Sequence, residues 1–425
     1  MVVNINVKYQ KTVIISPITL LTSVYALFSL VSASALVLSS SYIVIFYLNH
    51  ISFAELGFLF AISTICIAVL DYPTGALADT IGTKKVLIIA YSSFMISWII
   101  LFISESIFGF ILAILIAALG HSQLSGTLEA WYANRYKALN GDMNIFRNKI
   151  GKISSLRLFF TAALVALGGL LANFIGILFV FLFQSVLCGF TAILALLIIN
   201  DPDIKKPKEK QTFKDQLHQF KGNLTEGLRT TLQMPIFFGL LLGSTFAGAS
   251  QQVWSLVTQP ALLDAGSSLL LLGLTFSLAS IANALGYLLG GKVPHKISEK
   301  NASFLIWLFV PIFYALMYLG SEMSSILLLS ISVLGYSFVV GMYNPNMGQW
   351  YHKIIPDQHR TALLSLRSTV RNFVFTLTLL FSGVIIELSS KQIGFLMALI
   401  ISCGTLLMIK SLKNNENQVM TLSDV

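Results

Sequence analysis

Few ionisable residues fall inside the apolar stretches of this 425-residue sequence, and these few are the candidates for chemistry. Asp71, Glu129 and Arg157 each lie in a different stretch, and Arg367 and Arg371 are four residues apart in a later one. A carboxylate among apolar side chains holds its proton more tightly, whereas a neighbouring guanidinium favours its ionised form. The residues therefore predict reversible protonation or charge pairing, because ionisable groups are costly in apolar surroundings.

Glu129 is our first candidate for a proton site, and Arg157, in the next apolar stretch, is its candidate partner. His121, Ser125 and Glu129 are spaced by four residues, so a continuous helix would place all three on one face. Two alternatives stay open. Glu129 could belong to a structural ion pair, and His121 could be a hydrogen-bonded interior side chain.

Polar and aromatic residues in the other apolar stretches could line a cavity for a solute. The candidates are Tyr25, Gln251, Gln252, Trp254, Asn283 and Asn344. Amide and aromatic groups, in a chain with 31 Phe, favour an amphipathic organic solute over a sugar or a free ion. Hydrogen bonding between helices is the alternative for each candidate. The Asn344–Pro345 pair also predicts an interruption of its helix.

The composition is typical of a protein that spans a membrane. Apolar residues make up 56% of the chain and charged residues 11%, and the mean hydropathy is +0.81. A soluble domain carries about 25% charged residues. The composition therefore argues against a soluble enzyme, a nucleic-acid-binding protein and a disordered scaffold. The six histidines are dispersed and the three cysteines lie far apart, so we expect no metal site, disulfide or cofactor.

Twelve apolar stretches are long enough to cross a bilayer, which takes about 20 residues per helix. They cover residues 19–48, 53–77, 86–104, 107–131, 150–173, 175–199, 235–258, 268–290, 303–320, 325–350, 365–388 and 392–410. They do not alternate apolar and polar residues as barrel strands do. The predicted fold is therefore an all-α integral membrane protein with twelve transmembrane helices.

One long polar segment divides these helices into two sets of six. We expect an N-terminal half over residues 1–200, a central cytoplasmic loop over 201–232, and a C-terminal half over 233–425 that ends in a short cytoplasmic tail. Transporters built from two repeats bind their solute between the repeats, near the middle of the membrane.

The basic residues favour one orientation of the chain. If the N-terminus is cytoplasmic, every Lys and Arg except Arg157 and Lys391 falls in a cytoplasmic segment or near the cytoplasmic end of a predicted helix. Cytoplasmic loops carry the excess of basic residues in membrane proteins. We therefore expect a multi-pass protein of the cell (inner) membrane with both termini in the cytoplasm, and we attribute the net charge of +9 to this topology.

The loop between the second and third predicted helices carries the most specific motif. It reads Gly75-Ala76-Leu77-Ala78-Asp79-Thr80-Ile81-Gly82-Thr83-Lys84-Lys85. Through Gly75, Asp79, Gly82 and Lys85 it resembles the signature loop of the major facilitator superfamily, although threonines replace two of the family's basic residues. The resemblance extends over nearly the whole chain, including residues 355–362 before the eleventh helix. It implies two pseudo-symmetric six-helix halves and a gating role for the loop.

The resemblance also implies a secondary active transporter and not an enzyme. We expect proton-coupled export of an amphipathic, drug-like compound by alternating access, with the solute, protons and the lipid bilayer as partners of a monomer. The family's antiporter pattern is missing, because Leu164 and Val165 replace its Gly-Pro pair. Proton-coupled uptake of a nutrient or a siderophore-like metal chelate is therefore the alternative. A membrane-embedded enzyme would need clustered catalytic side chains, which the sequence lacks.

Overall fold

The computed structural model describes residues 16–75, 81–124, 126–201, 213–291 and 297–412. It contains twelve candidate membrane spans, which confirms the predicted all-helical fold. The first half consists of α1 (Pro17–Ser34), α2 (Ile43–Leu48), α3 (Phe53–Gly75), α5 (Thr83–Ile103), α6 (Ile107–Leu124), α7 (Thr127–Ala138), α8 (Met143–Ile175) and α9 (Ile177–Ile198).

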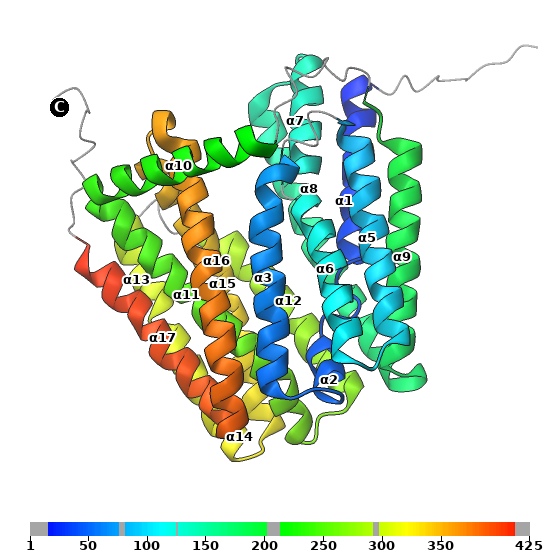
Figure 1. Cartoon of the computed structure of the whole chain (residues 1–425), viewed down its shortest axis with the longest axis vertical. Helices are drawn as coiled ribbons and strands as arrows, with labels where there is room; N and C mark the ends of the chain where they lie inside the picture. The colour runs from blue at the N-terminus through cyan, green and yellow to red at the C-terminus, as the bar shows by residue number, and fades with distance from the viewer. Residues whose placement is uncertain (1–15, 76–80, 125, 202–212, 292–296, 413–425) are drawn as a thin grey trace, which may run out of the picture.

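After α10 (Phe213–Gln233), the second half begins. It consists of α11 (Pro235–Asp264), α12 (Leu269–Gly290), α13 (Glu299–Trp307), α14 (Phe309–Glu322), α15 (Ile326–Ile354), the 3-10 helix η2 (Asp357–His359), α16 (Arg360–Leu388) and α17 (Lys391–Ser411). Figure 1 shows the two halves side by side, with α10 lying across one end of the bundle. We call this the α10 end and the opposite one the far end.

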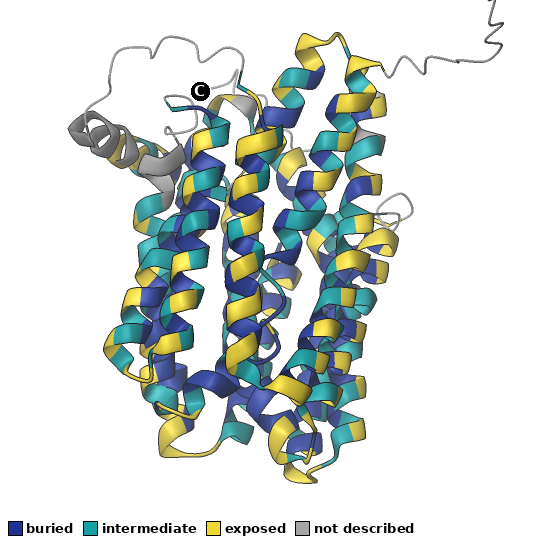
Figure 2. Cartoon of the chain, turned by 90° about the vertical axis from the view of Figure 1, so that its right-hand side faces the viewer, coloured by how far each residue is buried: buried dark blue, intermediate teal, exposed yellow. Residues whose placement is uncertain are grey.

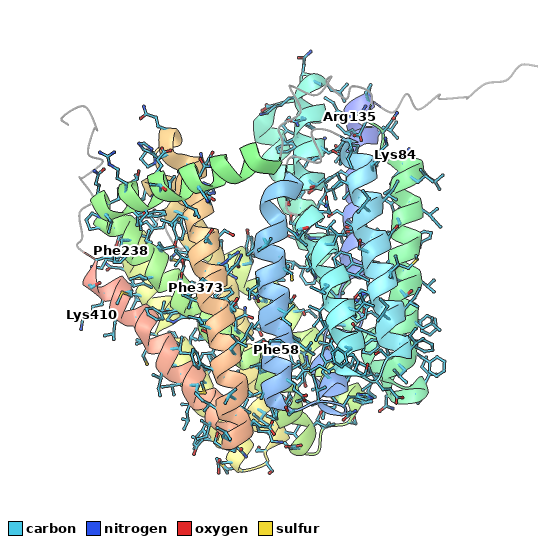
Figure 3. The ribbon with its side chains drawn as sticks, in the orientation of Figure 1. Phe58, Lys84, Arg135, Phe238, Phe373 and Lys410 are labelled. Carbon is cyan, nitrogen blue, oxygen red and sulfur yellow. The ribbon has the colours of Figure 1, made fainter. Side chains whose placement is uncertain are left out.

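The outer surface of the bundle is apolar, as lipid requires. Phe58 and Phe373 lie on this surface and are 45% and 64% exposed (Figure 3). Exposed residues follow the outer faces of the helices, and buried ones lie between them (Figure 2). The exposed faces of these helices are rich in large apolar side chains, whereas the exposed faces of helices in a soluble protein are polar.

α10 is attached to the second half. Gly227 lies so close to α16 that a Cβ atom on it would come within 2.7 Å of the carbonyl oxygen of Ala362. Beside this contact, Glu226 Oε1 and His359 Nδ1 are 2.7 Å apart. The close backbone approach and the polar contact together fix α10 on the start of α16.

The first predicted span is divided, which corrects the expectation of one helix over residues 19–48. The chain leaves the helix after α1 and turns before α2 begins. Two glutamine side chains bind the backbone at this break: Gln184 Oε1 accepts from Ser39 N at 2.7 Å, and Gln259 Oε1 accepts from Val44 N at 3.1 Å. Because lipid offers no hydrogen bonds, a break inside the membrane needs such partners.

α15 is continuous where the sequence predicted an interruption. Pro345 lies inside this helix, so the interruption predicted at Asn344–Pro345 was wrong. α15 packs closely against α12: a Cβ atom on Gly286 would lie 2.1 Å from the carbonyl oxygen of Phe338. Packing of this kind stabilises α15 although the proline removes one backbone hydrogen bond.

The two halves meet through two helix pairs. α8 packs against α12, and α3 packs against α16. Each pair has glycines facing each other near the far end: a Cβ atom on Gly57 would lie 3.0 Å from the Cα of Gly383, and one on Gly169 would lie 3.0 Å from the Cα of Gly273. Small residues allow helix backbones to approach this closely in membranes.

Hydrogen bonds between the halves also lie toward the far end. Within the described residues, five of them join α1–α9 to α11–α17. They run from Tyr42 to Leu269, from Val44 to Gln259, from Gln259 to Ser40, from Phe53 to Glu387 and from Ser277 to Ala162. The Ser277–Ala162 bond lies deepest in the bundle, and the other four lie near the far end itself.

The facing glycines give a first prediction. A Cβ atom on Gly383 would lie 2.6 Å from the carbonyl oxygen of Phe53, so Gly383→Val should force α3 and α16 apart. Overpacking costs about 1–3 kcal/mol. The buried Ser41 at the far end, replaced by cysteine in a chain lacking the native cysteines, should then react about tenfold faster with a membrane-impermeant maleimide.

Gly151→Val is the matched control, because no atom lies within 4 Å of a Cβ atom at Gly151. It should leave the labelling rate of the cysteine at position 41 unchanged. Equal rates in the Gly383→Val and Gly151→Val chains would show that the glycine contact does not hold the far end closed.

Candidate functional site

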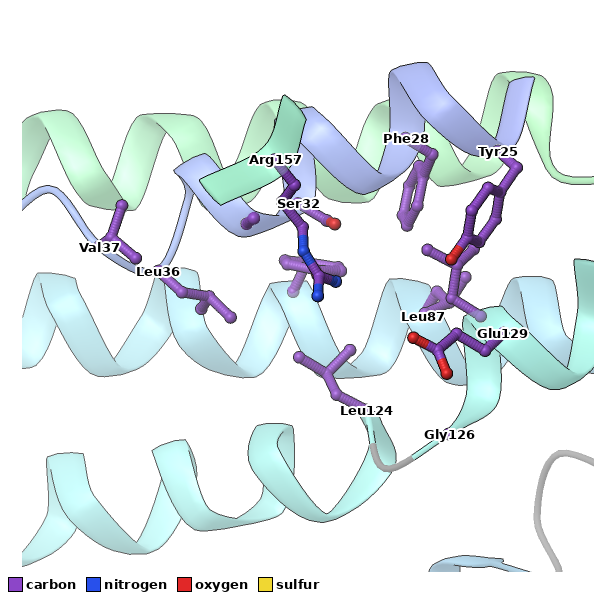
Figure 4. Close-up of a pocket in the computed structure, with 13 residues that line it drawn as sticks. Tyr25, Phe28, Ser32, Leu36, Val37, Leu87, Leu124, Gly126, Glu129 and Arg157 are labelled. Atoms are coloured by element: carbon purple, nitrogen blue, oxygen red, sulfur yellow. The ribbon is translucent and has the colours of Figure 1, made fainter. Parts of the chain in front are cut away.

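A cavity of about 410 Å³ lies within the first half (Figure 4). Its walls come from α1 and the turn after it, α5, the junction of α6 and α7, and α8. It is lined by Tyr25, Phe28, Ser32, Ala33, Leu36, Val37, Leu87, Tyr91, Leu124, Gly126, Leu128, Glu129 and Arg157. The sequence-predicted pair Glu129 and Arg157 therefore lines one cavity, which we call the charged cavity.

Glu129 reaches the charged cavity because of a break in the fourth span. Gly126 has a φ of 69°, a left-handed conformation that separates α6 from α7. Glu129 then falls in the first turn of α7. Free backbone N–H groups and the helix dipole favour a negative charge at this position.

Because of the same break, the predicted polar face of His121, Ser125 and Glu129 does not form. The sequence placed His121 and Glu129 on one face of a continuous helix, and this is wrong because the helix ends before Gly126. His121 instead packs edge-on against Phe94, with ring centroids 4.7 Å apart, and it lines neither cavity. Ser125, the third member of the predicted face, lies outside the described residues.

Arg157 enters the charged cavity from α8, whereas Glu129 enters it from α7 (Figure 4). Neither side chain forms an ion pair or a hydrogen bond with another described residue, and none joins the two to each other. The charged cavity thus has one acidic and one basic side chain in its lining, and neither is paired with another described residue.

Aromatic rings form the wall beside Glu129. Tyr25 stacks on Tyr132 with ring centroids 4.2 Å apart and an interplanar angle of 11°. Tyr132 stacks in turn on Phe146 at 5.1 Å, and its hydroxyl lies 3.1 Å from that of Thr22. This stack fixes the Tyr25 ring in place, next to the Glu129 carboxylate (Figure 4).

A second cavity, of about 310 Å³, lies in the second half between α11, α12 and α15. It is lined by Gln251, Gln252, Trp254, Ser255, Asn283, Tyr336, Ser337 and Val340. Four of the predicted cavity residues are therefore brought together here. None of the residues that line it is charged, and we call it the neutral cavity.

Some polar groups of the neutral cavity form hydrogen bonds within the protein, and others have no partner among the described residues. Asn283 Nδ2 donates to the carbonyl oxygen of Ser337 at 3.0 Å. Trp254 packs against Tyr336 with ring centroids 5.0 Å apart, and its indole N–H has no partner among the described residues. Buried donors usually find an acceptor, so this N–H is suited to a solute or a water molecule.

One residue from each cavity, Arg157 and Asn283, lies at a similar depth in the bundle. Ser277 Oγ donates to the carbonyl oxygen of Ala162 at 2.7 Å, which joins α12 to α8. From this bond toward the α10 end, Arg157 is five residues along α8 and Asn283 is six residues along α12. At a rise of about 1.5 Å per residue, they lie about 7.5 and 9 Å beyond the bond.

Several predicted site residues lie elsewhere. Asn344 is exposed and lines neither cavity. Arg367 stacks on the Tyr351 ring at 3.9 Å, and Arg371 lies 5.8 Å from the centre of the Phe375 ring, so both contact aromatic side chains of the second half.

The loop that carries the family motif is described only in part. Gly75 ends α3, and Gly82, with a φ of 90°, precedes α5, where Lys85 lies in the first turn. Asp79 and the side chain of Asp71 lie outside the described residues.

Sequence reasoning missed several lining residues. Ser32 and Tyr91 line the charged cavity, and Tyr336 and Ser337 line the neutral one. Their signal is a polar group within an apolar stretch, but many serines and tyrosines elsewhere in the bundle share it and only bond to a neighbouring helix. Helix-to-helix contacts, which the sequence does not specify, decide between the two roles.

The described residues contain twelve candidate membrane spans in two halves, with a cavity in each half, and this arrangement is that of a membrane transport protein of the two-repeat class. The profile of the Major Facilitator Superfamily matches residues 21–378, and the chain belongs to this family. It is accordingly a secondary transporter of a small molecule and not an enzyme.

Similar proteins agree with this family. The chain is 24% identical over 350 residues to "Uncharacterized MFS-type transporter YxaM" of Bacillus subtilis (strain 168), an alignment that covers 80% of this chain and 82% of the relative. Among solved structures, the nucleoside transporter NupG has a TM-score of 0.72 at 16% identity and covers 93% of this chain and 99% of its own. A mutant of NupG gives a TM-score of 0.73 at 16% identity, with 92% and 99% covered. These two structures share the fold.

The break at Gly126 gives a second prediction. A left-handed conformation costs a residue with a Cβ atom about 1–2 kcal/mol. Gly126→Ala should therefore lower the free energy of unfolding by about 1 kcal/mol, measured by thermal unfolding of the purified protein. Gly151→Ala, inside the regular helix α8, should raise it by up to about 1 kcal/mol. Equal effects of the two substitutions would contradict the left-handed break.

Proposed function

We propose that this protein exports a small amphipathic organic solute by alternating access, in exchange for protons. The observation that carries the proposal is the arrangement of the cavities: one lies in each half, and Arg157 and Asn283 lie at similar depths just beyond the deepest hydrogen bond between the halves. A solute held between the halves can be released at either end as they rock against each other.

The contacts between the halves support this movement. The five hydrogen bonds and the two glycine pairs lie toward the far end. Separation of the halves at that end would break a small set of bonds and no ion pair among the described residues. Packed interfaces of this kind switch between discrete arrangements.

Glu129 is the proton site in our proposal. Its carboxylate lines the charged cavity in the first turn of α7, with Arg157 on the opposing helix. Water in an open cavity favours the ionised carboxylate, and closure that removes water favours the protonated one. The carboxylate would therefore bind and release a proton as access alternates.

The α10 end faces the cytoplasm in this proposal. Lys84 and Arg135 lie near this end (Figure 3), and Lys410 lies in the last turn of α17. An excess of basic residues is expected on the cytoplasmic side. Both termini would then be cytoplasmic, in the inner membrane, and the closed far end would face outward. Because each cavity is built from helices of one chain, we also propose that the monomer is the working unit.

The transport experiment uses everted membrane vesicles that acidify their interior by respiration and contain a pH-sensitive dye. A proton-coupled exporter should raise the interior pH when an amphipathic test compound is added outside. Vesicles without the protein are the control. If no compound does so, and nutrients or metal chelates instead drive proton entry into right-side-out vesicles, the chain is an importer.

Glu129→Gln tests the proton site. The amide keeps the shape of the side chain but cannot bind a transferable proton, so proton movement with the solute should fall by more than about tenfold while membrane insertion stays normal. Glu322→Gln, on the exposed last turn of α14, is the matched control and should transport normally. An unchanged rate and pH profile in the Glu129→Gln chain would assign Glu129 a structural role.

A further inference from the structure

The two charged side chains that line the charged cavity indicate which charges a bound solute should carry. Glu129 and Arg157 have opposite charges and line the same cavity, yet no ion pair joins them in the described part of the chain. Glu129 is exposed and Arg157 is half-buried, so water in the open cavity can solvate both groups. A solute that displaces this water would leave each charge without hydration, which is costly unless the solute replaces it. Each group therefore favours a partner supplied by the solute.

The surroundings of the two groups fit different partners. The Tyr25 ring lies beside Glu129 and is fixed by its stack on Tyr132 (Figure 4). A carboxylate next to a tyrosine side chain suits an ammonium group, which gains a charge-assisted ion pair with the carboxylate. Arg157 presents a planar guanidinium, with Ser32 among its neighbours in the lining, and such a group binds a carboxylate through two parallel hydrogen bonds.

The neutral cavity fits an uncharged part of the same solute. Gln251, Gln252 and Asn283 offer amide groups, and Trp254 offers an aromatic face and a free indole N–H. These groups bind polar planar structures through hydrogen bonds and stacking. Arg157 and Asn283 lie at similar depths on α8 and α12, and these two helices pack against each other across the interface between the halves.

We propose that the transported solute is a zwitterion, with an ammonium group at Glu129 and Tyr25, a carboxylate at Arg157 and an uncharged planar group in the neutral cavity. Amino acids with aromatic side chains and small peptides have this chemistry. A molecule with a single charge would leave either Glu129 or Arg157 without a partner, which is the basis of discrimination against it. The inference names the substrate of the proposed transport site and rests on that proposal.

The test measures binding, so that its outcome does not depend on proton coupling. Two scaffolds are used, tryptophan and the dipeptide alanyl-tryptophan, each as the zwitterion, as the cationic methyl ester and as the anionic N-acetyl derivative. Isothermal titration calorimetry with the purified full chain should give a dissociation constant at least about tenfold lower for the zwitterions than for their singly charged derivatives.

Two variants assign the charges to the residues. In Glu129→Gln the preference for the zwitterion over the N-acetyl derivative should disappear, because the ammonium group loses its partner. In Arg157→Gln the preference over the methyl ester should disappear. Arg157→Lys keeps the charge and should retain a reduced preference, which serves if Arg157→Gln fails to fold. Glu322→Gln should bind all six compounds as the unaltered chain does.

Equal affinity for the zwitterions and for either derivative would overturn the proposal, and so would the absence of binding by both zwitterions. These outcomes are distinct from failure of the proposed function. A chain that binds singly charged cations and exchanges them for protons is an exporter with a different substrate. A chain that binds zwitterions without moving protons keeps this inference and loses the proton coupling.

Discussion

The absence of hydrogen-bonding partners in lipid is the constraint on which this structure depends. Every backbone group within the membrane must be paired by the protein, so the chain is helical wherever it faces lipid. The break between α1 and α2 is possible because Gln184 and Gln259 bind its backbone. Gln259 belongs to the second half and also donates to the carbonyl oxygen of Ser40. The pairing required by the break therefore also holds the halves together at the far end.

The site follows from the same constraint, because irregular backbone that faces a cavity is tolerated. Gly126 ends α6 within the fourth span, and its left-handed conformation directs the first turn of α7 toward the charged cavity. A continuous helix would keep Glu129 on the face of His121, which packs against Phe94. One residue without a side chain thus determines where the negative charge lies.

Hydropathy predicts much of this fold, because each span is a local property of about 20 residues. It gives the twelve spans, and the rarity of charges within them singles out Glu129 and Arg157, which share a cavity. The break at Gly126 and the continuity of α15 through Pro345 were not predictable in this way. Both features depend on contacts with other helices, and the hydropathy of a segment does not show which helices that segment will contact. Asn344 was misplaced for this reason, whereas Gln251 and Trp254 line the neutral cavity.

The hydrogen bond between Ser277 and Ala162 is the contact between the halves that lies deepest in the bundle, so it is a possible pivot for their movement. Arg157 and Asn283 lie about 7.5 and 9 Å from this hydrogen bond along their helices. Gly290, at the α10 end of α12, lies 13 residues or about 20 Å from it. A rotation of about 15°, as between packed subunits, moves the cavity residues by about 2 Å and the helix end by about 5 Å. In the proposed alternating access, the α10 end would therefore open by more than twice the distance that Arg157 and Asn283 move, and the groups proposed to bind the solute would stay nearly in place.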